Sequence, residues 1–120
     1  MKYPSLILGL SLLLVGLNRQ DAQLQKKVIG SWARDTYFQM TLSPDGSFVS
    51  HWTTTNASPT YKGTWKVQAG TMISTITNCI ANGTTNFERV GSVDSFTIVR
   101  ANSKELVYSN QNQIITFRRE

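Results

Sequence analysis

Two tripeptides, Gly30-Ser31-Trp32 and Gly63-Thr64-Trp65, decide the fold of this chain. Each places a glycine two residues before a tryptophan, inside a run in which side chains of two kinds alternate. The stretch Tyr61-Lys62-Gly63-Thr64-Trp65-Lys66-Val67 shows this best, with lysine and threonine on one face only. Such a period of two is typical of a strand with one buried face and one solvated face. We therefore predict that the first tripeptide begins a small β-barrel and that the second lies in a central wall strand.

Turn chemistry divides the chain after residue 30 into short strands. Ser43-Pro44-Asp45-Gly46 has a proline that presets the backbone and a glycine that accepts a positive φ. Ala81-Asn82-Gly83-Thr84 contains the Asn-Gly pair that most strongly indicates a hairpin. A short helical turn is expected within 21–27, and no helix is expected after residue 30. The strands that follow the first turn are predicted at about 47–55, 61–67, 71–80, 85–91, 93–100, 104–109 and 112–119.

These strands predict the fold class. Eight or nine short strands joined by turns are typical of an antiparallel meander, roughly one strand per ten residues. A long meander with open edges tends to pair with other chains, so it should close on itself. We therefore predict an all-β fold: one small, antiparallel, up-and-down β-barrel of about eight strands.

Residues 1–22 precede this barrel and have the pattern of an export signal. Lys2 is followed by an apolar run that ends at Leu17, which suits the core of a signal peptide and is short for a membrane span. Leu17 stands where a lipoprotein-processing sequence needs cysteine, so lipidation at that point is excluded. Ala22 is the candidate for the last residue of a cleaved peptide. We expect residues 1–22 to be a signal peptide or an uncleaved N-terminal membrane segment, and residues 23–120 to form the barrel domain.

Charge and side-chain chemistry exclude several function classes. The formal net charge is +5, but the basic residues are scattered and form no stripe interleaved with aromatic residues, so nucleic-acid binding is not expected. One cysteine, Cys79, cannot form an intrachain disulfide or a cysteine-based zinc site. One histidine, His51, and scattered carboxylates make neither a metal site nor a nucleophilic triad. We expect no catalytic residue, no metal and no cofactor.

The order of these motifs resembles that of bacterial lipocalin-like domains, which are small members of the calycin group, often associated with the cell envelope. The resemblance rests on four motifs and covers roughly residues 28–119. The motifs are Gly30-Ser31-Trp32, Ser43-Pro44-Asp45-Gly46-Ser47-Phe48, Gly63-Thr64-Trp65-Lys66-Val67 and the terminal Phe117-Arg118-Arg119. It implies a barrel with one closed end and a protein exported to the periplasm or cell envelope of a bacterium.

The resemblance also implies how the closed end is built. Trp32 would plug that end, and an arginine of the last strand would lie over its ring. The parity of the last strand puts Arg119 on the same face as Ile115 and Phe117, so Arg119 rather than Arg118 is expected over the indole. Gly30 would let a neighbouring backbone approach closely. We expect these residues to be structural.

Two interpretations of the barrel interior remain open. It either binds a small apolar or amphipathic ligand or is a filled core, in which case the protein would be an envelope interaction or inhibitor module with an unknown protein partner. We expect contact with the membrane only through an uncleaved N-terminal segment, and no enzymatic activity. In 71–80, alternation puts Asn78 on the face of Met72, Ser74, Ile76 and Ile80, and either Asn78 or Ser74 would orient a ligand. The expected lining is Phe38, Met40, Phe48, Trp52, Tyr61, Trp65, Met72, Ile76, Asn78 and Tyr108.

Overall fold

The computed structural model describes residues 19–53, 58–85 and 87–120. The expected export signal therefore lies mostly outside the described residues. Residues 19–28 are helical, which is more than the single turn expected there. The strands are β1 (Gly30–Arg34), β2 (Phe38–Leu42), β3 (Ser47–Trp52), β4 (Thr60–Gln68), β5 (Thr71–Ala81), β6 (Thr84–Thr85), β7 (Val93–Ala101), β8 (Glu105–Asn110) and β9 (Gln113–Arg119), with a 3₁₀ helix, η1 (Phe87–Arg89), between β6 and β7.

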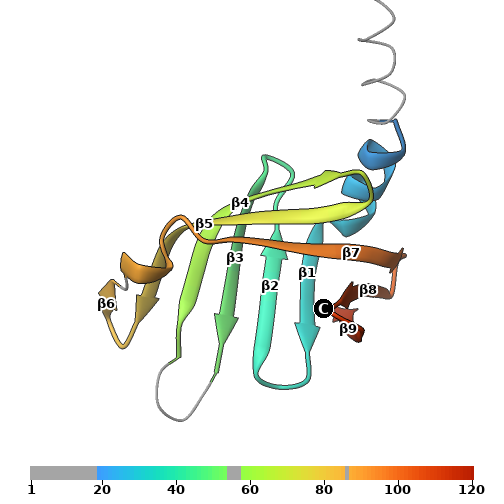
Figure 1. Cartoon of the computed structure of the whole chain (residues 1–120). Coiled ribbons are helices and arrows are strands. Elements are labelled where there is room, and N and C mark those ends of the chain that lie inside the picture. Colours follow the sequence, from blue (N-terminus) through green and yellow to red (C-terminus); the bar gives the residue numbers. More distant parts are fainter. Residues whose placement is uncertain (1–18, 54–57, 86) are drawn as a thin grey trace, which may run out of the picture.

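The strands close into an antiparallel barrel of eight strands, which confirms the predicted fold class. Each strand pairs with its neighbour in the chain, except that β5 pairs with β7 across the short β6 hairpin. Closure comes from β1, which pairs with β9 through Trp32 opposite Arg119 and Ala33 opposite Arg118. Figure 1 shows the strands surrounding one interior. The helix lies at one end, and β6 and η1 lie far from the helix.

One predicted strand is wrong. Residues 85–91 were expected to be extended, but β6 ends at Thr85 and the chain turns through η1 to Gly91. The barrel explains this difference, because the chain must pass from the outer end of β5 to its other edge. The amide of Gly91 donates to the carbonyl of Ile76, and the amide of Ile76 donates to the carbonyl of Ser92. The chain thus pairs with β5 again part-way along. From Thr85 to Val93 it has more residues than the facing part of β5, from Ile80 to Thr75, so these residues cannot all pair as one strand.

A bulge in β5 changes which side chains face inward. Lys62 pairs with Asn78, but the next residue, Gly63, pairs with Ile76, so Thr77 is an extra residue. The extra residue reverses the alternation, so Cys79 is buried to 1% exposure while Asn78 pairs with the outward-facing Lys62. The expected single face from Met72 to Ile80 is therefore wrong beyond Ile76.

Trp32 fills the closed end of the barrel, as the resemblance implies. Its side chain is 0% exposed, and its indole N–H donates to the carbonyl of Val28, at 2.8 Å. The guanidinium carbon of Arg119 lies 4.2 Å from the centroid of the Trp32 ring. Gly30 has a φ of 138°, which residues with a side chain rarely adopt, and a Cβ there would also collide with Nη1 of Arg119, so its close neighbour is this guanidinium and not a backbone segment.

Arg119 also binds backbone carbonyls from both sides of the closed end. Nη1 donates to Ile29 O and Nη2 to Lys27 O, both at 3.0 Å, where the helix ends and β1 begins. Nε donates to Ser103 O at 3.0 Å, in the turn between β7 and β8. One planar, permanently charged group therefore joins the helix, β1, the β7–β8 turn and its own strand β9.

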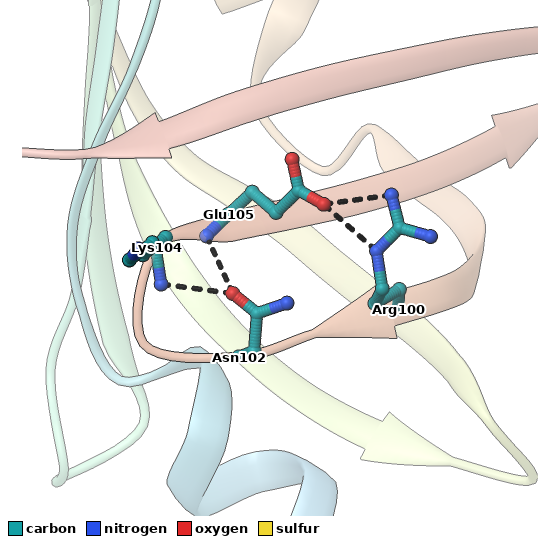
Figure 2. A network of polar contacts seen from close by, with 4 residues as sticks. All are labelled: Arg100, Asn102, Lys104 and Glu105. Carbon is teal, nitrogen blue, oxygen red and sulfur yellow. Dashed lines mark hydrogen bonds and ion pairs between the residues drawn. The ribbon is translucent and has the colours of Figure 1, made fainter.

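The β7–β8 turn is held in shape by its own side chains (Figure 2). Oδ1 of Asn102 accepts hydrogen bonds from the amides of Lys104 and Glu105, at 2.8 and 2.9 Å. Glu105 also pairs with Arg100, whose Nη2 lies 2.7 Å from Oε1. Asparagine is suited to this position because its short side chain accepts bonds from the turn that follows it. The turn thus presents its carbonyls to Arg119 in a fixed position.

The helix is attached to the opposite side of the closed end by Asp21. Its carboxylate is 6% exposed and accepts hydrogen bonds from the amides of Ala69 and Gly70, at 2.9 and 3.1 Å, in the β4–β5 turn. Oε1 of Gln25, one helical turn later, accepts from the amide of Val67. The expected boundary between residues 22 and 23 falls inside this helix, one residue after a side chain that the barrel binds.

We predict that Arg119→Lys lowers the free energy of unfolding by about 2 kcal/mol, because a lysine ammonium cannot replace a planar guanidinium that donates to several carbonyls. Urea denaturation followed by circular dichroism measures this. Arg118→Lys is the matched control, since Arg118 is exposed and faces outward on the same strand. Equal midpoints for the two variants would contradict the role given to Arg119.

We predict that Asp21→Ala destabilises the barrel by about 1–3 kcal/mol, because two amides of the β4–β5 turn lose their acceptor. Gln23→Ala, in the same helix but exposed, should change stability by less than about 0.5 kcal/mol. Thermal melting of both variants is the measurement. A loss in Gln23→Ala as large as that in Asp21→Ala would contradict the role given to the Asp21 carboxylate, because alanine is itself a good helix former.

Candidate binding cavity

The barrel interior contains a cavity of about 330 Å³. This volume lies at the lower end of the range typical of small-molecule sites. An eight-stranded barrel is just wide enough to be filled by side chains or to hold one small ligand, and here the side chains leave this volume unfilled. The lining residues are Arg34, Phe38, Met40, Leu42, Phe48, Ser50, Trp52, Tyr61, Met72, Ser74, Ile76, Arg89, Asp94, Phe96, Tyr108, Ile115 and Phe117.

Strand register gives the cavity a floor and a mouth. Leu42 pairs with Gly30, next to the Arg119 clasp, so it lies near the closed end. Arg34 and Phe38 pair with each other at the far ends of β1 and β2. Trp52, which pairs with Phe38, is half-buried, whereas Leu42 is buried. Exposure therefore rises away from the helix, and the cavity opens at the end opposite the helix.

Aromatic rings pack against one another around one side of the wall instead of filling the centre. The ring of Phe38 lies 4.5 Å from that of Trp52 and 5.6 Å from that of Phe117. Tyr108 contacts Phe117 edge-on and stacks on Phe96, with both pairs of centroids 5.3 Å apart. Such pairs are stable arrangements that hold the rings in place. The wall is therefore a largely preformed apolar surface.

Three hydroxyl groups interrupt this apolar lining. Ser50 and Tyr108 expose only 7% and 4% of their surface, and Ser74 is half-buried. None of the three side-chain oxygens has a hydrogen bond to a described residue, yet no described side-chain polar atom is both fully enclosed and unpaired. These hydroxyls therefore reach the cavity itself. Burial raises the pKa of Tyr108, so its hydroxyl stays protonated and can donate to a molecule in the cavity.

Three charged side chains also line the cavity. Arg34 ends β1, Asp94 is the second residue of β7 and pairs with Ser74, and Arg89 ends η1. The guanidinium carbon of Arg89 lies 5.6 Å from the ring centroid of Tyr61, another lining residue. All three belong to the end of the barrel away from the helix. The mouth is thus polar and charged, while the floor is apolar.

Most of the side chains expected inside the barrel do line this cavity. These are Phe38, Met40, Phe48, Trp52, Tyr61, Met72, Ile76 and Tyr108, together with Ser74. Trp65 does not: it is buried at the closed-end side, and its indole N–H donates to Ser43 O at 3.0 Å. Asn78 does not either, because the bulge at Thr77 turns it outward. Of the two residues proposed to orient a ligand, only Ser74 is in the lining.

The sequence analysis missed the charged part of the site. Arg34 lies at a strand end, where alternation alone does not distinguish a rim residue from a surface residue. Arg89 lies within the segment wrongly expected to be a strand, and Asp94 is near the start of the strand that follows it. The parity of the last strand, which placed Ile115 and Phe117 with Arg119, did contain the signal that these two side chains face inward.

No catalytic constellation is evident in the part of the chain that the structure describes. A ring nitrogen of His51 lies 2.8 Å from Oγ1 of Thr60, and His51 does not line the cavity. Across residues 19–53, 58–85 and 87–120, no three His, Cys, Asp or Glu side chains are grouped to hold a metal ion. In the same residues, no helix has both the length and the apolar character to span a bilayer.

A closed eight-stranded barrel with an indole plug, a clasping arginine and one open end is a lipocalin-like fold. Two solved structures share this fold. One is a lipocalin-like protein from Bacteroides thetaiotaomicron VPI-5482, 23% identical, with 78% of this chain and 96% of that chain covered and a TM-score of 0.54. The other is an uncharacterized protein from Bacteroides eggerthii DSM 20697, 11% identical, with 77% and 98% covered and a TM-score of 0.56. This chain therefore has the bacterial lipocalin-like fold.

These likenesses are structural. No protein-family model matches the sequence, and no curated protein sequence matches it. The two structures define the fold and leave the function to be argued from the cavity.

Proposed function

We propose that this protein is an exported, non-enzymatic binder of one small apolar or amphipathic molecule, held inside the barrel. The observation that carries the proposal is the cavity of about 330 Å³ with hydroxyl groups that reach it and have no partner in the described chain. Its lining combines aromatic and aliphatic side chains with a few polar groups, which is the usual composition of a small-molecule site.

A filled barrel would look different. Protein interiors are packed to the density of organic crystals, and their buried hydroxyl groups are nearly always hydrogen-bonded. Here Tyr108 is almost completely buried, but its hydroxyl reaches the cavity and bonds to no described residue. The wall rings pair with one another and leave the centre open. These features favour a site for a guest molecule over the alternative of an interaction module with a solid core.

The structure offers a built-in reporter for the test. Trp52 lines the cavity, whereas Trp32 and Trp65 do not. We predict that decanol and the fluorescent probe N-phenylnaphthylamine change tryptophan emission saturably, because they alter the surroundings of Trp52. Trp52→Phe should remove the emission change while calorimetry still detects binding.

A cavity-filling variant supplies the control. Ser74→Phe adds a ring inside the barrel and should abolish binding, and Ser95→Phe adds the same ring on the exposed face of β7 and should not. Circular dichroism and melting confirm that both variants are folded. If neither probe binds the native barrel, or if Ser74→Phe binds as well as the native barrel does, the proposal is wrong and the interaction module becomes the better interpretation.

A further inference from the structure

We propose that the cavity selects amphipathic molecules with a carboxylate head group, which Arg34 and Arg89 bind at the mouth while the apolar tail enters the barrel. This inference rests on the proposed function and names the class of ligand. Three observations support it: the charged side chains in the lining, their position along the barrel, and the absence of hydrogen bonds from the two arginines to described residues.

Both arginines are free to bind an anion. Among the described residues there is one ion pair, between Arg100 and Glu105, on the outside of the barrel. Neither Arg34 nor Arg89 donates a hydrogen bond to any described residue, although both line the cavity. Arg89 is oriented by its contact with the Tyr61 ring, which leaves the N–H groups at its edge available. A guanidinium presents paired donors that match the two oxygens of a carboxylate.

Asp94 sets the charge that the mouth can accept. With two guanidinium groups and one carboxylate, the lining has a single positive charge in excess. That balance favours a ligand with one negative charge over a neutral one, and disfavours a cationic one. Removing the carboxylate, as in Asp94→Asn, should therefore strengthen binding of an anion.

The apolar floor fixes the direction of the ligand. Leu42, Met72 and the aromatic wall offer no charge to a buried carboxylate, and burying an unpaired ion costs several kcal/mol. The head group should therefore remain at the mouth, and the tail should lie against the wall. The groups that compete for the head group from within are the hydroxyls of Ser50, Ser74 and Tyr108, of which the Tyr108 hydroxyl belongs to the most buried residue.

The experiment compares decanoate with decanol and decylammonium by calorimetry at neutral pH. We expect decanoate to bind about tenfold more tightly than decanol, decylammonium to bind most weakly, and the preference for decanoate to shrink as salt is added. Arg34→Gln and Arg89→Gln should each weaken decanoate binding far more than decanol binding, so that most of the preference for decanoate is lost. Arg118→Gln, which removes the same charge from the outer face of β9, should preserve the preference.

The outcomes separate the two proposals. Equal affinities for decanoate and decanol would overturn the head-group assignment and leave the binding function standing. Failure of all three compounds to bind would overturn both. If Tyr108→Phe lowers decanoate affinity and the arginine variants do not, the head group lies at depth and the inference is wrong.

Discussion

The clasp of Arg119 over Trp32 is the interaction on which this barrel depends. A guanidinium above an indole gains cation–π attraction. Its N–H groups donate hydrogen bonds to carbonyls of the helix end and of the β7–β8 turn. Glycine suits position 30 because its φ of 138° would strain any other residue and because the missing side chain leaves room for the guanidinium. The first and last strands are therefore joined at one end by mutually dependent contacts: their strand pairing, the stacking of Arg119 on Trp32 and the hydrogen bonds of Arg119. This set gives the cavity its floor.

Closing one end firmly allows the other end to stay open. At the closed end, the helix is bound through Asp21 on one side and through Arg119 on the other, so the plug is surrounded. Toward the mouth, the rings of Phe38, Trp52 and Phe117 stabilise one another along the wall. The side chains of the wall also form the buried hydrophobic core, and they pack around the cavity. A cavity can persist because the contacts that hold the fold lie around it.

Alternation and turn chemistry predicted most of the fold because they act locally. The parity of the last strand was enough to select Arg119 over Arg118. The bulge at Thr77 and the turn through η1 could not be predicted in this way, since both arise where β5 must meet two partners at different positions. One extra residue reversed the alternation and removed Asn78 from the lining. The attachment of Asp21 depends on contacts between residues almost 50 positions apart, which no local pattern encodes.

Three arginines at the two ends of the barrel show why geometry, and not residue type, decides function here. Arg119 binds backbone carbonyls with all three of its nitrogens, so its charge is committed to the fold. Arg34 and Arg89 line the same barrel and bond to none of the described residues. Arg34 is half-buried and Arg89 is exposed, so solvent or a ligand can reach both guanidinium groups. At the mouth, charged side chains in contact with solvent lie next to an apolar wall. A molecule with an anionic end and an apolar body can therefore bind the arginines and the wall together.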